Sequence, residues 1–376
     1  MQKLLFLLIP LLFLSACKQK PETAETSGST ASTVKYAQGF SIEKKVGGTE
    51  IILKNPWPGA EETFKYWLIE EGATVKEHTK KDAIVQVPLE SIVVTSTTHI
   101  PSLEMLGIEN KLVGFPNMNY ISSEKTRKLI TEGKIKELGK NEDINTEVLI
   151  ELAPDAVITF AVEGNNKTVS TIQKTGIPVL YNSDWTETHP LGKAEWIKFF
   201  GALFGKEREA DSIFASIEKN YLEAKSLAAN ATTRPTVLSG AMYKDIWYMP
   251  QGDSWAARFI DDAHGEYLWS EDKGTGSLSL NLESVLEKGQ SADFWIGPGQ
   301  FTSLQQMEEA HTVYTQFEAF QNKKIYSFTT KKGATGGVLY YELAPNRPDL
   351  VLKDIIKILH PELSLDHELY FFSFLE

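Results

Sequence analysis

The sequence predicts an α/β protein made of two lobes that a long helix joins, with a small β-rich extension at the N-terminus. Three observations support this prediction. Short apolar strands alternate with helices in two separate regions, a charged segment with helical periodicity lies between these regions, and each region contains one copy of a similar motif. The two copies read NTEVLIELAPDAVITF (145–160) and NLESVLEKGQSADFWIG (281–297).

The first residues predict export and lipid attachment. A short basic start precedes the apolar run Leu4–Leu14, which is about half as long as a bilayer-spanning helix and therefore indicates a signal peptide, residues 1–16. The run ends in LSAC, which is similar to a bacterial lipobox, and in that pattern Cys17 becomes the first mature residue and carries lipid. Cys17 is the single cysteine of the chain, so no internal disulfide can form. A cleaved, soluble export signal is the alternative.

Composition narrows the possible partners. Residues 17–35 predict a disordered tether, because the stretch up to Thr33 has no large apolar side chain to bury. The net charge of −12 argues against nucleic acid or anionic lipid as the main partner. We therefore expect an exported monomer that is held at a membrane by its lipid and faces the periplasm or the cell exterior.

Residues 36–90 predict a β-rich N-terminal extension. The runs FSIEKK, TEIILK, FKYWLIE and AIVQVP are alternating or apolar, and Gly47-Gly48 and Pro56–Gly59 supply turns. We expect a small layer of hairpins that packs onto the lobe that follows.

Residues 91–190 predict the first α/β lobe. Strands are expected at 91–96, 111–115, 156–160 and 178–181, and helices at 101–107, at 122–133, within the first motif copy and after Asn166. Strands that alternate with helices indicate a parallel sheet covered on both faces, so each lobe should be Rossmann-like.

Residues 191–233 predict connecting helices, and residues 234–376 the second lobe. In 206–230, apolar side chains recur at helical spacing, and about 24 helical residues would span roughly 36 Å, which suits a rod between two lobes. Strands are then expected at 236–242, 292–297 and 324–329, followed by a last helix at 347–360 that Pro361 ends.

This arrangement resembles the class III substrate-binding proteins of ABC importers, which include binders of ferric siderophores, haem and cobalamin. The resemblance covers about residues 91–360 and is carried by SIVVTSTTHIPSLEMLGIENKLVGF, both motif copies, the long helix and RPDLVLKDIIKILHP. In that family one glutamate per lobe pairs with arginines of the two permease subunits, and the matching positions here are Glu147 and Glu283. The resemblance thus implies a permease homodimer as partner. Each acid, taken alone, could also be an ordinary first-turn residue that the helix dipole favours.

The resemblance also implies a ligand between the lobes: an iron chelate or another metal-containing organic complex. A ferric siderophore is the first choice, with cobalamin or haem as alternatives. Ligands of parallel sheets bind beyond the carboxyl ends of the strands. At such positions, or near them, we predict a ligand-binding role for Thr97, Thr98, His99, Asn119, Tyr120, Trp185, Tyr243, Trp247, Tyr248, Trp255, Phe301 and Arg347. The tryptophans and tyrosines of 243–255 could equally form a local aromatic core, and Arg347 could lie on the surface.

Other functions have less support. The sequence contains no Walker loop, no Gly-x-Ser-x-Gly, no His-Glu-x-x-His and no cysteine nucleophile, so we do not expect an enzyme. His99, His189 and His264 lack the spacing of metal ligands, so neither a bare metal nor any cofactor besides the lipid on Cys17 is expected. A surface lipoprotein that captures ligand without an ABC permease remains possible, but it would not need Glu147 and Glu283.

Overall fold

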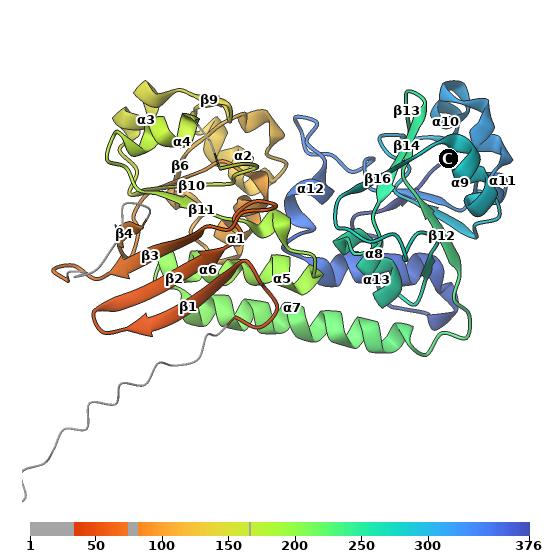
Figure 1. Cartoon of the computed structure of the whole chain (residues 1–376), viewed down its shortest axis with the longest axis horizontal. Coiled ribbons are helices and arrows are strands. Elements are labelled where there is room, and N and C mark those ends of the chain that lie inside the picture. The colour runs from red at the N-terminus through yellow and green to blue at the C-terminus, as the bar shows by residue number, and fades with distance from the viewer. Residues whose placement is uncertain (1–33, 74–81, 165–166) are drawn as a thin grey trace, which may run out of the picture.

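The computed structural model describes residues 34–73, 82–164 and 167–376. Two lobes lie side by side, with the helix α7 (Glu207–Ala228) running beneath both of them (Figure 1). The predicted signal peptide, Cys17 and the tether up to residue 33 lie outside the described residues. Within the part of the chain that is described, no helix is both long and apolar enough to cross a bilayer.

The N-terminal lobe is built on a parallel sheet of order β11-β10-β5-β6-β7. Its strands are β5 (Ile92–Val94), β6 (Leu112–Phe115), β7 (Lys136–Glu137), β10 (Ala156–Thr159) and β11 (Val179–Tyr181). Its helices are α1 (Ile100–Met105), α2 (Glu124–Thr131), α3 (Thr146–Leu152) and α4 (Lys167–Gln173), and a short pair, β8 (Gly139–Lys140) and β9 (Asp143–Ile144), precedes α3. The predicted alternation of strands and helices is confirmed.

The C-terminal lobe repeats this plan with the sheet β15-β12-β17-β18-β19, in which only β19 is antiparallel to its neighbour. Its strands are β12 (Thr236–Ser239), β15 (Glu266–Tyr267), β17 (Phe294–Ile296), β18 (Ile325–Ser327) and β19 (Ser373–Phe374). Its helices are α8 (Trp255–Asp262), α9 (Leu282–Gly289), α10 (Leu304–Ala310), α11 (Glu318–Gln321), α12 (Leu339–Leu343) and α13 (Pro348–Leu359).

The two motif copies occupy equivalent places in the two sheets. α3 leads into β10, which pairs with β5, the first strand of its lobe. α9 leads into β17, which pairs in the same way with β12, the first strand of the other lobe. The repetition in the sequence therefore corresponds to a structural repetition.

A second, antiparallel sheet in the C-terminal lobe was not predicted. It consists of β13 (Ala241–Tyr243), β14 (Ile246–Pro250) and β16 (Ser277–Leu280). The strand predicted at 236–242 is interrupted at Gly240, whose φ of 78° lies in the left-handed region. A Cβ at Gly240 would lie 1.9 Å from the carbonyl oxygen of Tyr248, so this turn requires glycine.

The connecting helices are α5 (Pro190–Glu195), α6 (Ile197–Leu203) and α7. α7 buries one apolar stripe against α6 and α13, and the buried residues are Ala210, Phe214, Ile217, Tyr221, Ala224 and Ala228. This stripe has the predicted helical spacing, so the rod between the lobes is confirmed.

The extension forms a sheet of order β1-β2-β3-β4, with β1 (Phe40–Lys45), β2 (Gly48–Lys54), β3 (Thr63–Ile69) and β4 (Ala83–Gln86). The prediction of successive hairpins is confirmed for β1, β2 and β3, which pair antiparallel. It is wrong for β4, which pairs parallel with β3. The sheet packs onto the N-terminal lobe, as expected. The N–H of Tyr181 donates to the Tyr66 hydroxyl at 2.8 Å, and the rings of Phe40 and Trp196 lie 4.3 Å apart.

Candidate ligand-binding cleft

The C-terminal lobe contains a pocket of about 380 Å³ at the carboxyl ends of its central strands. Ser239 ends β12 and Gly240 follows it, Ile296 ends β17 and Gly297 follows it, and Phe328 follows β18. This is where the strand-end rule places a ligand site. The walls are completed by β14, the start of α8, and α12.

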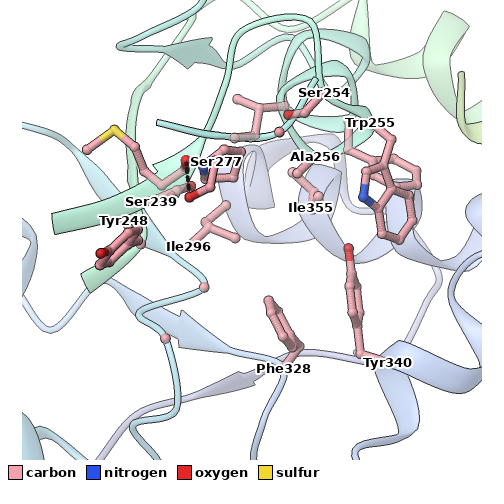
Figure 2. A pocket seen from close by; sticks show the side chains of 18 of the residues that line it. Ser239, Tyr248, Ser254, Trp255, Ala256, Ser277, Ile296, Phe328, Tyr340 and Ile355 are labelled. Atoms are coloured by element: carbon pink, nitrogen blue, oxygen red, sulfur yellow. Dashed lines mark hydrogen bonds between the residues drawn. The ribbon is translucent and has the colours of Figure 1, made fainter. Parts of the chain in front are cut away.

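Aromatic side chains form much of this pocket. Phe328 and Tyr340 stack with ring centroids 4.2 Å apart, and Trp255 lies 5.7 Å from Tyr340. Figure 2 shows these three rings on one side of the pocket and Tyr248 on the other. Such rings provide a large apolar contact area with few rotatable bonds, which suits the recognition of a flat or apolar ligand surface.

A second pocket, of about 310 Å³, lies at the strand ends of the N-terminal lobe. It is lined by Thr95, Ser96 and Thr97 after β5, by Phe115, Pro116 and Tyr120 after β6, by Asn141 and Phe160, and by Gly337, Val338 and Tyr341 of the other lobe. Tyr341 lines both pockets and is half exposed. The two pockets therefore adjoin at Tyr341 and form the two halves of one cleft between the lobes.

Four of the predicted ligand-binding residues line this cleft: Thr97, Tyr120, Tyr248 and Trp255. Neither of these two pockets is lined by Thr98, Asn119, Trp185, Tyr243 or Phe301. Thr98 and Asn119 instead accept hydrogen bonds from the other lobe through their backbone oxygens, and Phe301 packs against Tyr314 with ring centroids 5.7 Å apart.

The predictions for Trp247 and His99 are wrong. Trp247 has no exposed surface, because the alternation of β14 turns it into the core, where its ring stacks 5.2 Å from that of Trp295. His99 is buried beside Phe200, and burial lowers its pKa. Arg347 forms two 2.9 Å hydrogen bonds with the buried carboxylate of Asp349 and lines neither pocket, so its ligand-binding role stays a prediction.

Sequence reasoning missed Phe328, Tyr340 and Tyr341, which contribute much of the aromatic surface. One available signal was the position of Phe328 at the carboxyl end of the strand predicted at 324–329, one residue beyond the observed β18. Tyr340 and Tyr341 belong to a short helix that the sequence pattern did not reveal.

The side chains of His99, His189 and His264 do not converge on a metal site. His189 caps the start of α5 by accepting the Leu191 N–H at 3.1 Å, and His264 lies beside His360. Over the described residues, no group of three or more His, Cys, Asp or Glu side chains could hold a metal ion.

A bridging segment, residues 330–346, crosses from the C-terminal lobe to the N-terminal lobe and includes α12, which Figure 1 shows between them. Asn346 donates to the Thr98 carbonyl at 2.7 Å and accepts from the Ser102 hydroxyl at 2.7 Å. A Cβ at Gly333 would lie 2.6 Å from the Cα of Ser122, so the two backbones are in close contact. The bridging segment thus joins the lobes independently of α7.

Glu342 is a buried acidic residue of the bridging segment. Its two carboxylate oxygens accept the backbone N–H groups of Ser122 and Ser123, at 2.6 and 2.9 Å, immediately before α2. Burial raises the pKa of Glu342 to about 7, although these two hydrogen bonds oppose the shift, and the charge of Glu104 adds to it. The contact between the lobes is therefore sensitive to pH near neutrality.

The two predicted docking acids are exposed and equivalently placed. Glu147 lies in the first turn of α3 and Glu283 in the first turn of α9. Asn145 and Asn281 cap the two helices by accepting N–H groups, at 3.1 and 2.9 Å. In Figure 1 both helices lie on the side of their lobe that faces away from α7. Neither carboxylate is buried, and in this view both helices lie on the same side of α7.

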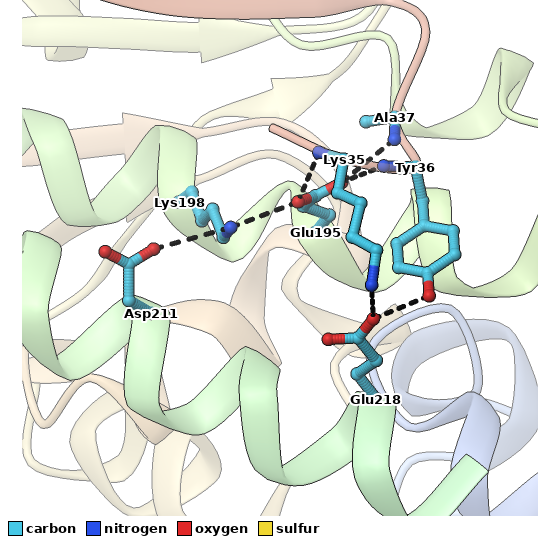
Figure 3. Close-up of polar contacts among 7 residues, drawn as sticks. All are labelled: Lys35, Tyr36, Ala37, Glu195, Lys198, Asp211 and Glu218. Atoms are coloured by element: carbon cyan, nitrogen blue, oxygen red, sulfur yellow. Dashed lines mark hydrogen bonds and ion pairs between the residues drawn. The ribbon is translucent and has the colours of Figure 1, made fainter. Parts of the chain in front are cut away.

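The start of the described chain is fixed to the connecting helices (Figure 3). The buried carboxylate of Glu195 accepts the backbone N–H groups of Lys35, Tyr36 and Ala37, at 2.8, 2.6 and 3.0 Å. The Lys35 ammonium and the Tyr36 hydroxyl both donate to Glu218 on α7. These contacts hold the start of the described chain beside α7.

The chain belongs to the periplasmic binding protein family, whose model matches residues 92–331. The resemblance to class III substrate-binding proteins is thereby confirmed, and the chain is a substrate-binding protein. Two uncharacterized lipoproteins of Methanocaldococcus jannaschii are similar over most of this sequence. One is 26% identical, over 90% of this chain and 84% of its own, and the other is 23% identical, over 92% and 86%.

Solved structures share the fold at low sequence identity. A possible iron-binding, periplasmic solute-binding protein from Staphylococcus epidermidis has a TM-score of 0.57 at 16% identity and matches 73% of this chain and 100% of its own. The haem-binding protein HutB of Vibrio cholerae has a TM-score of 0.55 at 18% identity, over 70% and 99%. The triscatecholate siderophore binding protein FeuA of Bacillus subtilis has a TM-score of 0.53 at 16% identity, over 73% and 94%.

The first prediction concerns Glu342. A raised pKa means that the folded protein keeps a proton that the unfolded chain releases, so this contribution to stability is complete below about pH 4.5 and is lost as the pH rises to about 7. The Glu342→Gln variant should lack this loss, which amounts to up to about 3 kcal/mol in the wild type. Urea unfolding at pH 5 and at pH 7.5, for the wild type and the variant, measures this pH-dependent loss of stability.

The exposed Glu124 lies in the first turn of α2 and lines, with Glu342, a groove between α2 and the bridging segment, so it provides the control. Glu124→Gln should keep the wild-type pH profile. Identical pH slopes for the wild type and Glu342→Gln would contradict the assignment.

The second prediction concerns the N-terminal attachment. Glu195→Ala leaves three backbone N–H groups without their acceptor and removes a buried charge, so it should lower the free energy of unfolding by about 3–5 kcal/mol. Thermal unfolding measures this loss, and limited proteolysis should cut faster near Lys35. Glu223→Ala, which removes one exposed ion pair from α7, should change stability by less than about 1 kcal/mol. Equal effects of the two variants would disprove the role of Glu195.

Proposed function

We propose that this chain is the lipid-anchored substrate-binding protein of an ABC importer. It captures an iron chelate, or another metal-containing organic complex, between its lobes and delivers it to a dimeric permease. The observation that carries the proposal is the pair of exposed acids, Glu147 and Glu283, at equivalent positions of two repeated lobes. A twofold permease can be met by a protein with this repeated surface.

A ferric siderophore remains the first choice of ligand, and cobalamin and haem are the alternatives. Support for a large organic ligand comes from the aromatic pocket walls and from two adjoining pockets of about 380 and 310 Å³. Solved proteins of the same fold include binders of haem and of a triscatecholate siderophore. Binding, rather than catalysis, is the function that this arrangement supports.

The mechanism we infer is capture with little movement of the lobes. α7 is continuous, and the bridging segment adds a second connection, so a wide opening would have to break several interlobe hydrogen bonds. A ligand shifts the balance between open and closed states only by its difference in affinity for the two. The permease would then recognise Glu147 and Glu283 at the separation that the ligand-bound lobes set, mainly through orientation and encounter rate.

Charge reversal tests the role of the two acids. The double variant Glu147→Arg, Glu283→Arg should lose most uptake of labelled ligand in cells and should keep the wild-type affinity in solution, because both side chains lie outside the cleft. Glu209→Arg, Glu223→Arg makes the same change of charge on α7 and should keep uptake.

If uptake persists in the Glu147/Glu283 double variant, the protein does not dock through these residues. The chain would then be better described as a surface lipoprotein that captures its ligand without this kind of permease contact.

Lipid attachment at Cys17 is a separate proposal that the relatives described as lipoproteins support. Cys17→Ser should abolish incorporation of labelled palmitate in expressing cells and should release the protein from the membrane fraction, since anchoring depends on the buried acyl chains. Ser29→Ala in the same segment is the control and should remain labelled. Continued labelling of Cys17→Ser would exclude this residue as the lipid site.

A further inference from the structure

The two pockets of the cleft have neutral linings. All residues that line its two pockets have uncharged side chains. The C-terminal half offers aromatic rings together with the hydroxyls of Ser239, Ser254, Thr275 and Ser277. The N-terminal half offers Thr95, Ser96, Thr97, Tyr120 and Asn141 among apolar residues. A ligand would thus meet apolar surface and neutral hydrogen-bonding groups.

Lys193 and Arg347 are two basic residues near the cleft, and both are already engaged by protein groups. The ammonium of Lys193 lies 5.2 Å from the ring of Trp255, but it is buried and donates to the carbonyl oxygens of Asp184 and Trp185, at 2.9 and 3.0 Å. Arg347 is paired with Asp349. Neither residue lines a pocket, so neither is placed to neutralise an anionic group there.

The start of α8 is the other place where an anion could gain from positive potential, because helix N-termini attract negative charge. Ser254 caps this helix, and its hydroxyl oxygen accepts the N–H of Ala257 at 3.3 Å. The cap uses one of the free N–H groups, and the aromatic ring of Trp255 follows it at the pocket wall. At this wall a ligand therefore meets a neutral hydroxyl group and an aromatic ring.

One polar atom in the N-terminal half lacks a partner. Oδ1 of Asn141 is buried and accepts no hydrogen bond from the described residues, while the Asn141 amide nitrogen donates to the Thr95 carbonyl at 3.2 Å. A buried acceptor without a donor is unfavourable. A ligand that presents an N–H or O–H group would satisfy it.

We propose that the cleft selects an uncharged chelate that combines an apolar face with hydrogen-bond donors such as amides, and that it rejects multiply anionic chelates. This inference rests on the proposed function and narrows its ligand class. A neutral ferric trihydroxamate with a peptide backbone, or a corrinoid rimmed by amides, fits this description. A ferric triscatecholate or haem with ionised carboxylates would bury negative charge without a partner, within a protein whose net charge is −12.

Equilibrium dialysis of the full mature protein against four probes tests the selection. The probes are ferrichrome, cyanocobalamin, ferri-bacillibactin and haemin. At least one neutral probe should bind, and both anionic probes should bind at least about 100-fold more weakly than the better neutral probe. Tighter binding of an anionic probe would overturn the charge selection and leave the importer function standing. Binding of none of the four would remove the proposed ligand class, and with it this inference.

A designed change in charge gives a second readout. Tyr341→Arg places a cation where the two pockets meet, at a half-exposed position that tolerates a long side chain. It should reduce the preference for neutral over anionic probes by about 10-fold or more, because a charged hydrogen bond then becomes available to the anion. Tyr243→Arg makes the same change at an exposed position outside both pockets and should leave the preference unchanged. Equal effects of the two variants would contradict a local role of the neutral lining.

Discussion

The structure depends on the apolar stripe of α7, because both lobes pack against this one helix. The first half of α7 is held from the N-terminal side, where Lys198 forms an ion pair with Asp211 at 3.4 Å. The second half is held by the C-terminal lobe, where Tyr221 and Lys225 donate to Asp262 at 2.5 and 2.6 Å. A single rigid helix, about 33 Å long at 1.5 Å per residue, thereby sets the distance between two separate sheets.

The bridging segment holds the two halves of the cleft in contact. With α7 alone, the strand ends of the two lobes could separate; the contacts of Glu342 and Asn346 with the N-terminal lobe hold them together on the other side. Tyr341 belongs to the same segment and lines both pockets, so the residues that join the lobes also shape the cleft. A site that is largely formed beforehand spends less binding energy on ordering its walls.

The sequence predicted the elements that periodicity determines and failed where tertiary contacts decide. Strand alternation and the stripe of α7 were sufficient for the sheets and the rod. The same two-residue alternation in β14 buries Trp247 and exposes Tyr248, but the antiparallel sheet had to be recognised before the two neighbours could be distinguished. The pairing of Arg347 with Asp349 was not predicted, because it depends on a buried helix start that charge patterns do not reveal.

Charge is distributed in a way that links the fold to the proposed transport. The acidic residues that resemble docking groups lie on the exposed first turns of α3 and α9, whereas the linings of the two pockets are neutral. Binding an uncharged ligand inside such a cleft leaves the electrostatic potential at Glu147 and Glu283 almost unchanged. The permease could then distinguish the loaded protein only by the relative positions of the lobes, which α7 and the bridging segment together control. Charge thus provides the encounter with the membrane partner, and geometry provides the signal that the cleft is occupied.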